Sequence, residues 1–221
     1  DKPVGRKQVL TAPPVKRTAM AHGIPVFQPG TLRDAAQAEN IRALAPELIV
    51  VVAYGRILPP EVLAIPQYGC INLHVSLLPR YRGAAPVQWA VINGEKTTGV
   101  SIMYLNEGLD TGDILRVSPV EIGENETSGE LFERITQEGV RTLLAAMEDI
   151  AAGTAQARPQ NDAEATLAQK TRIVEPDGTI KVTDFGIARF SRSELLATGS
   201  TDKAIGSVHY ISPEQARGEI T

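Results

Sequence analysis

Hydrophobic and polar residues alternate along residues 71–76, which read Ile-Asn-Leu-His-Val-Ser. Alternate residues of a strand share one face, so this pattern predicts a strand whose Ile, Leu and Val lie in a core. Asn72 and His74 should then lie side by side on the opposite face. Pro79 favours a loop soon after this strand, because proline cannot donate a hydrogen bond to a sheet. The two polar side chains would thus lie near the carboxyl end of a strand, where open α/β sheets bind ligands.

The rest of the hydrophobic pattern switches between helical and strand periods. A continuous apolar run at 48–54 is typical of a strand buried on both faces of a parallel sheet. Thr127 and Glu130 have the spacing of a capping box that opens a long amphipathic helix. Residues 151–169 turn polar and predict a surface linker. The other predicted elements are helices at 13–22, 31–45 and 86–93 and strands at 24–27, 97–105 and 114–122.

This alternation of strands and helices predicts the α/β fold class, doubly wound around a mostly parallel sheet. The net charge of −4 argues against the broad basic surface of a DNA-binding protein. The run at 48–54 is too short to cross a membrane, and no export signal opens the given sequence. Cys70 is the only cysteine, which excludes an internal disulfide and fits a reducing compartment. We therefore expect a cytoplasmic protein without a DNA or membrane partner.

Asn72 and His74 have side chains that suit acyl chemistry. The amide can donate a hydrogen bond to a carbonyl oxygen, and the imidazole can move a proton or stabilise an oxyanion. A lone strand histidine is nevertheless more often a hydrogen-bonded structural residue. An aspartate in a glycine-containing loop, such as Asp110, usually caps a turn. The residue types alone leave both a structural and a catalytic role open.

Two separated segments change this balance. Residues 72–86 read Asn-Leu-His-Val-Ser-Leu-Leu-Pro-Arg-Tyr-Arg-Gly-Ala-Ala-Pro, and residues 109–115 read Leu-Asp-Thr-Gly-Asp-Ile-Leu. Together they closely resemble the methionyl-tRNA formyltransferases, and the resemblance runs from the start of the chain to about Lys170. It implies an enzyme of translation initiation that transfers a formyl group from 10-formyltetrahydrofolate to the α-amine of methionyl initiator tRNA.

The resemblance also implies a catalytic set. Asn72 and a protonated His74 would bind the oxyanion that develops on the formyl group, and Asp110 would support His74 and a proton relay. No metal is expected. A related formyltransferase or hydrolase that acts on another amine, or on the folate itself, remains an alternative.

Two segments are implied to hold the folate. An Arg-Ile-Leu segment after the strand at 48–54 would bind the pterin ring through main-chain groups, although an ordinary strand-to-helix connection would read the same way. The loop after His74 would lie beside the cofactor. The residues concerned are Arg56, Ile57, Leu58, Ser76, Leu77, Leu78 and Pro79.

Residues 1–17 are locally basic within an acidic chain. Composition alone favours a solvated surface loop, whereas the resemblance assigns these side chains to the phosphates of the tRNA acceptor end. The residues are Lys2, Arg6, Lys7, Lys16 and Arg17. We expect a monomer that binds folate and initiator tRNA.

The sequence starts at Asp1, just after the strand, helix and strand with which similar formyltransferases begin. The resemblance therefore implies a sheet that is incomplete at its N-terminal side. Each buried unpaired backbone group costs roughly 1–3 kcal/mol, against a total stability of about 5–15 kcal/mol. We expect the chain as given to fold poorly and to have low activity.

Residues 171–221 do not continue the resemblance. Residues 173–189 predict a hairpin with Asp177 and Gly178 at its turn. Asp184, Phe185 and Gly186, followed by Ser-Pro-Glu at 212–214, resemble the activation segment of bacterial Ser/Thr protein kinases. The other kinase motifs do not occur, so no kinase activity is expected. We predict a partial catalytic domain at 1–170 and a kinase-like fragment at 171–221, and an inactive fusion is a further alternative.

Overall fold

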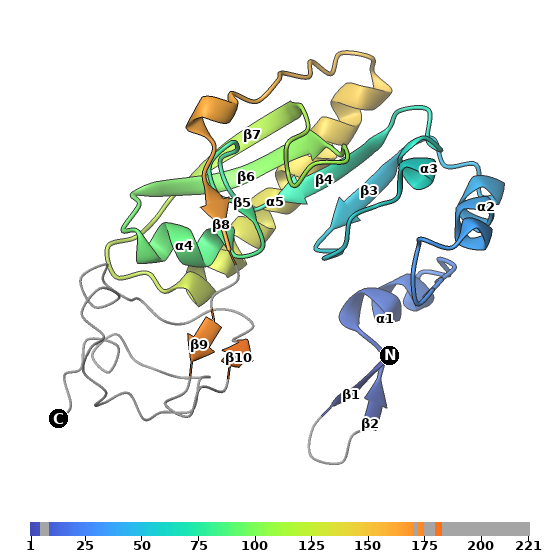
Figure 1. The fold of residues 1–221 in the computed structure, drawn as a ribbon, viewed down its shortest axis with the longest axis horizontal. Helices are drawn as coiled ribbons and strands as arrows, with labels where there is room; N and C mark the ends of the chain where they lie inside the picture. Colours follow the sequence, from blue (N-terminus) through green and yellow to red (C-terminus); the bar gives the residue numbers. More distant parts are fainter. Residues whose placement is uncertain (5–8, 170–171, 175–179, 183–221) are drawn as a thin grey trace.

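The computed structural model describes residues 1–4, 9–169, 172–174 and 180–182 (Figure 1). Its central feature is a four-stranded sheet in the order β3-β4-β6-β7. Strands β3 and β4 are parallel, whereas β4–β6 and β6–β7 are antiparallel pairs. The strands are β3 (Ile49–Val52), β4 (Cys70–His74), β6 (Thr97–Tyr104) and β7 (Ile114–Glu121).

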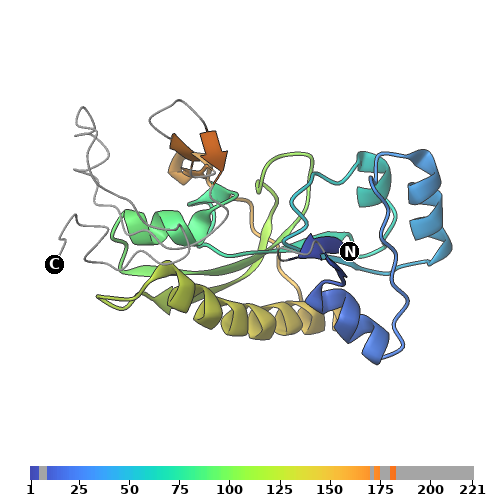
Figure 2. The same ribbon diagram turned by 90° about the horizontal axis from the view of Figure 1, so that it is seen from below.

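Helix α5 (Ser128–Ala151) runs along one face of this sheet and packs on β6 and β7 (Figure 2). It begins with the predicted capping box, in which the Thr127 hydroxyl accepts a hydrogen bond from the Glu130 N–H and the Glu130 carboxylate accepts one from the Thr127 N–H. The other helices are α1 (Pro14–Ala21), α2 (Ala35–Ala43), α3 (Pro60–Leu63) and α4 (Pro86–Ile92). The α/β class is confirmed, with its parallel pairing at β3–β4.

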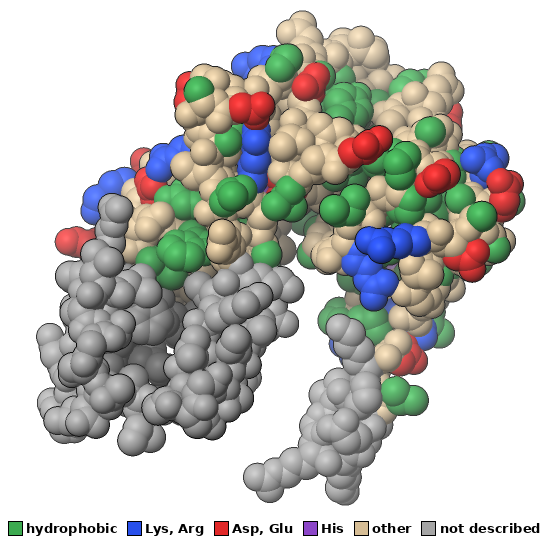
Figure 3. All heavy atoms as spheres, viewed as in Figure 1, with side chains coloured by type: hydrophobic (Ala, Val, Ile, Leu, Met, Phe, Trp, Pro, Cys, Tyr) green, Lys and Arg blue, Asp and Glu red, His purple; other side chains and the backbone are tan. Residues whose placement is uncertain are grey.

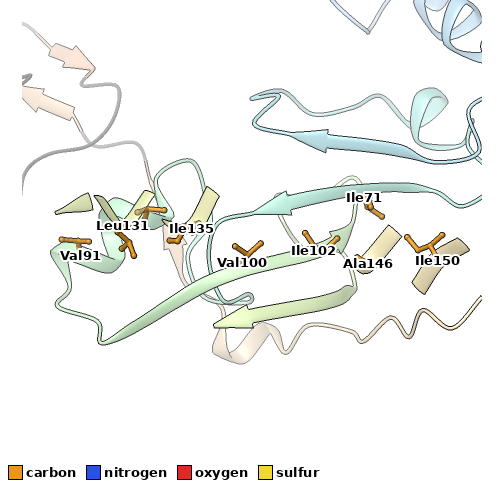
Figure 4. Packing of buried hydrophobic residues seen from close by; sticks show 9 residues of the cluster. Ile71, Val91, Val100, Ile102, Leu131, Ile135, Ala146 and Ile150 are labelled. Carbon is orange, nitrogen blue, oxygen red and sulfur yellow. The ribbon is translucent and has the colours of Figure 1, made fainter. Parts of the chain in front are cut away.

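The main core lies between the sheet and helices α4 and α5 (Figure 4). Ile71 of β4 is completely buried there, and Leu73 and Val75 pack against the same cluster. The predicted inward face of β4 is therefore confirmed. The other buried residues of the main core are Val87, Val91, Val100, Ile102, Leu131, Ile135, Ala146 and Ile150.

Strand β3 differs from its prediction of burial on both faces. Ile49 and Val51 pack towards α2 and α3, but Val50 and Val52 are 37% and 54% exposed. The reason is that β3 is an edge strand of the described sheet, and α5 packs on β6 and β7 rather than on β3.

Two N-terminal predictions also change. Residues 24–27 form no strand; they have no regular secondary structure, and their side chains are exposed. The helix predicted from residue 31 begins only at Ala35, because the Asp34 carboxylate accepts the Ala36 N–H and caps it there. Strands β1 (Lys2–Val4) and β2 (Val9–Thr11) pair as an antiparallel hairpin at the start of the chain.

The segment predicted as a surface linker folds back over the rest of the domain. It contains the short helix η1 (Asp162–Glu164) and strand β8 (Leu167–Ala168), which pairs in parallel with β5 (Arg82–Gly83). Arg158 and Ile114 exchange two main-chain hydrogen bonds of 2.8 and 2.9 Å. Main-chain bonds, which leave no hydrophobic period in the sequence, help to hold this segment in place.

The predicted hairpin in the tail is confirmed as an antiparallel pair of β9 (Arg172–Val174) and β10 (Ile180–Val182). Its turn at 177–178 lies outside the described residues, as do Asp184, Phe185 and Gly186. Among the helices in the described part of the chain, none has the length and apolar character to span a membrane.

Cys70 is buried in a second cluster, beneath α2 and α3, with Ala38, Leu58 and Val62. Burial raises the pKa of its thiol from 9.0 to about 11. The unfolded chain therefore loses this proton from about pH 9 upwards, while the folded chain keeps it until about pH 11. Folding stability should fall over this interval by up to about 1.4 kcal/mol per pH unit.

Urea unfolding at pH 8, 9 and 10 would measure this effect, with Cys70→Ala as the comparison. The variant should be less stable at pH 8 because it leaves a cavity, but its stability should fall less steeply with pH. Equal slopes for the two proteins would mean that the Cys70 thiol does not cause the loss.

Candidate active site

His74 lies at the end of β4 on the face opposite the core, and its side chain is only 7% exposed. Its Nε2 lies 2.9 Å from the Tyr81 carbonyl oxygen. A carbonyl can only accept a hydrogen bond, so Nε2 carries a hydrogen and donates it. This leaves Nδ1 as the nitrogen that faces Asp110, at 3.6 Å from its Oδ2.

Asp110 lies in the loop between β6 and β7 with a φ of +53°, a left-handed conformation that aspartate tolerates better than most residues. Its carboxylate is 13% exposed, and Oδ2 accepts the Gly83 N–H at 2.8 Å. The distance to His74 exceeds that of a direct hydrogen bond. The two side chains are therefore close neighbours without a direct hydrogen bond.

Asn72 lies two residues before His74 on the same face of β4 and is partly exposed. Residues two apart in a strand are separated by about 6.5–7 Å. An oxygen atom between them could therefore receive hydrogen bonds from the amide and from the imidazole. This pair of donors next to a carboxylate can stabilise an oxyanion and accept a proton, which is the chemistry of acyl transfer.

Gly83 connects Asp110 with the C-terminal segment. Its φ is +110°, and a Cβ at this position would lie 2.8 Å from the Ala168 carbonyl oxygen. Only glycine fits without displacing β8. The neighbouring Ala84 N–H donates to the same Ala168 carbonyl at 2.9 Å.

Tyr81 is held at both ends, which fixes the carbonyl that His74 contacts. Its N–H donates to the Thr166 hydroxyl at 2.8 Å. Its phenol donates to the Glu95 carboxylate and accepts a bond of 2.9 Å from the Asn93 amide. Burial raises the pKa of the Tyr81 phenol, so this donor keeps its hydrogen to a higher pH than an exposed tyrosine would.

The loop after β4 is shaped by two fully buried serines. The Ser101 hydroxyl donates to the Ser76 carbonyl at 2.7 Å and accepts the Leu78 N–H at 3.0 Å. The Ser76 hydroxyl donates to the Arg80 carbonyl at 2.7 Å. Of the predicted folate residues in this loop, Ser76 and Leu78 are buried, whereas Leu77 and Pro79 are partly exposed.

The other predicted folate segment leaves β3 at the same edge of the sheet, because β3 and β4 are parallel. Ile57 is 62% exposed, and the Arg56 guanidinium donates to the Gly30 carbonyl at 2.7 Å. Leu58 instead packs in the cluster around Cys70. Among the described contacts, no hydrogen bond or ion pair joins these three residues to His74 or Asp110.

The predicted tRNA-binding residues are only partly visible. Arg6 and Lys7 fall outside the described residues, and so does the side chain of Lys2. Lys16 forms an ion pair with Asp1 at 2.7 Å, which weakens the attraction of its ammonium group for a phosphate. Arg17 is exposed. Basic and acidic side chains are interspersed over most of the coloured surface in Figure 3.

The residues that hold the site together were not predicted from the sequence. The side chains of Ser101, Gln160 and Thr166 bond to loops of the site, and the Arg82 side chain bonds to Gln160. Arg82 lies within the segment 72–86 that carries the family resemblance, and this position could have indicated a role in the site. Gln160 and Thr166 lie in a polar stretch without periodicity, so no local signal indicated them.

Comparisons with known proteins show a consistent relationship. The sequence profile described as formyl transferase matches residues 1–147. A methionyl-tRNA formyltransferase from Alkaliphilus oremlandii is 52% identical over 168 residues, which cover 76% of this chain and 54% of that protein. One from Agathobacter rectalis is 49% identical over 166 residues, covering 75% and 54%. The chain thus spans about half the length of these curated relatives.

Solved structures give the same relationship. The formyltransferase PseJ from Anoxybacillus kamchatkensis, in complex with a formamido-sugar nucleotide and tetrahydrofolate, has a TM-score of 0.57 and 25% identity, covering 72% of this chain and 82% of that one. Glycinamide ribonucleotide transformylase 1 from Symbiobacterium toebii has a TM-score of 0.59 and 25% identity, covering 66% and 74%.

Proposed function

The chain belongs to the formyl transferase family, and from this premise we propose that it carries the catalytic site of a methionyl-tRNA formyltransferase. The reaction would transfer a formyl group from 10-formyltetrahydrofolate to the α-amine of methionyl initiator tRNA. The observation that carries the proposal is the 52% identity to a methionyl-tRNA formyltransferase over 168 residues, which include the site. The reaction belongs to translation initiation, so we place it in the cytoplasm. We assign it to residues 1–170 and treat residues 171–221 as a separate kinase-like fragment.

The residues on the outer face of β4 suit a formyl donor. When bound, 10-formyltetrahydrofolate supplies an activated formyl carbon, whose oxygen becomes negative as the methionyl amine attacks. The Asn72 amide would donate one hydrogen bond to this oxygen. Because Nε2 of His74 is committed to the Tyr81 carbonyl, the second donor would be Nδ1 of the protonated ring.

Asp110 would complete the set. Its carboxylate stabilises the positive charge on His74 and can take a proton from the attacking amine, directly or through a water molecule. The amine would add to the formyl carbon while Asn72 and His74 hold the oxyanion that develops, and the bond from this carbon to N10 would then break as the relayed proton goes to N10. The products are formyl-methionyl-tRNA and tetrahydrofolate, and this sequence of steps uses no metal.

We assign the two loops at the carboxyl edge of β3 and β4 to the folate. Arg56, Ile57 and Leu58 would hold the pterin from one side, and residues 76–79 from the other. Lys2, Arg6, Lys7, Lys16 and Arg17 would contact the tRNA phosphates.

An acceptor comparison tests the proposal. The purified chain would be given 10-formyltetrahydrofolate labelled with ¹⁴C in the formyl group. It would be tested with methionyl initiator tRNA, methionyl elongator tRNA or a nucleotide-linked amino sugar as acceptor. We expect label on methionyl initiator tRNA above the level of a reaction without protein. Label on the amino sugar alone, or release of formate with every acceptor, would support the alternative of a related formyltransferase or hydrolase.

A further inference from the structure

The side chain of Gln160 joins three parts of the site that are far apart in sequence. Its Nε2 donates to the carbonyl of Asp110 at 2.9 Å and to that of Gly112 at 2.7 Å. Its Oε1 accepts two hydrogen bonds from the Arg82 guanidinium, at 3.0 and 2.8 Å. A guanidinium only donates and a carbonyl only accepts, so the orientation of this amide is unambiguous. All of its hydrogen-bonding capacity is used.

These bonds form a closed ring of contacts that includes Asp110. From Gln160 the ring passes to the main chain of Asp110, then through its carboxylate to the Gly83 N–H. Gly83 follows Arg82 in the chain, and the Arg82 side chain returns to Gln160. Asp110 is therefore held at its carbonyl by Gln160 and at its carboxylate by Gly83, and the Arg82 side chain links these two residues.

The ring holds a conformation that the loop would not favour by itself. Asp110 has a φ of +53°, in a region that few non-glycine residues occupy. Arg82 is buried, with 8% of its side chain exposed, and its other partner Asp162 is 83% exposed. Gln160 is thus the more buried of the two partners of the Arg82 guanidinium, and it also fixes the main chain of the loop at Asp110 and Gly112.

We propose that Gln160 is a positioning residue, which holds the Asp110 carboxylate beside His74 through the main chain of residues 110–112. The inference deepens the proposed function and rests on it for its kinetic part. Gln160 itself is not placed against substrate, and its effect on the reaction would pass through Asp110.

Gln160→Met tests this inference because methionine has a similar size and cannot replace the hydrogen bonds. The turnover number for formyl transfer should fall by about 10–100-fold, as expected when a reacting group is displaced by about 1 Å. The KM for 10-formyltetrahydrofolate should change less than twofold. Gln156→Met makes the same change at an exposed position of the same segment and should leave both constants unchanged.

Gln160→Glu is the second variant, because its carboxylate still accepts from Arg82 but cannot donate to the two carbonyls. It should fold and show the same loss of turnover. In an Asp110→Ala background, Gln160→Met should lower turnover by less than twofold further, because the group it positions is gone. A full additional loss would mean that Gln160 acts on stability or on another residue, and would overturn the inference.

Amide hydrogen exchange of Gly83, measured by NMR, gives a readout that needs no activity. Its N–H is bonded to the Asp110 carboxylate, so exchange should become at least tenfold faster in Gln160→Met and Gln160→Glu. Unchanged exchange in both variants would overturn the inference. Faster exchange in a chain that formylates none of the acceptors would uphold the positioning role and reject the proposed function.

Discussion

Replacing His74 with alanine should lower the rate of formyl transfer by roughly 10²–10³-fold, the usual loss for one oxyanion donor. His74 is the imidazole on the face of β4 that carries Asn72, and Asn72 alone would remain to bind the formyl oxygen. The quantity to measure is the turnover number at saturating donor and acceptor. Because the loss arises in the transition state, the KM for the folate should change far less.

Two further variants make this result specific. His22→Ala removes an exposed histidine at the end of α1 and should keep the rate within twofold. His74→Ala leaves the Tyr81 carbonyl unpaired, whereas the amide of His74→Gln can still donate to it. Comparing the two variants therefore separates the loss of this structural hydrogen bond from the loss of catalysis. Parental turnover in His74→Ala, at equal folded concentration, would show that His74 is not a catalytic residue.

Replacing Ile102 with alanine should lower the free energy of unfolding by about 2–5 kcal/mol, the usual cost of removing a large aliphatic side chain from a core. Ile102 is completely buried between β6 and α5. A domain has only about 5–15 kcal/mol of stability in total, so this single change removes a large part of it.

Urea unfolding monitored by Trp89 fluorescence would measure the loss. Ile24→Ala is the matched control, because Ile24 is 58% exposed and its replacement should change stability by about 0.5 kcal/mol or less. If the two isoleucine variants lost the same stability, Ile102 would not be packed in the core as described.

Sequence patterns predicted those parts of the fold in which side chains repeat at a regular period. The alternation in 71–76 predicted which face of β4 is buried, and the spacing of Thr127 and Glu130 predicted the start of α5. The exposure of Val50 and Val52 could not be predicted in the same way. Their exposure depends on what packs against β3, and an apolar run carries no information about its neighbours.

For the candidate site, the motifs predicted that His74 and Asp110 act together, and the structure places them 3.6 Å apart. The parts that position them were not predictable. Gln160 and Thr166 act through single side chains across about 50 and 85 residues of sequence. Such long-range contacts, and the positive φ of Asp110, leave no periodic or local signal in the sequence.

The return of residues 158–169 across the candidate site affects when this site can form during synthesis of the chain. Translation adds about 5–20 residues per second, so Ala168 follows Gly83 by roughly 4–17 s. Once Ala151 has been added, the nascent chain has the four described strands of the central sheet and the whole of α5, but the residues that clamp the loops around His74 and Asp110 are still to come. The candidate site is therefore the last part of the described domain to be completed, and it is complete only once β8 has been added.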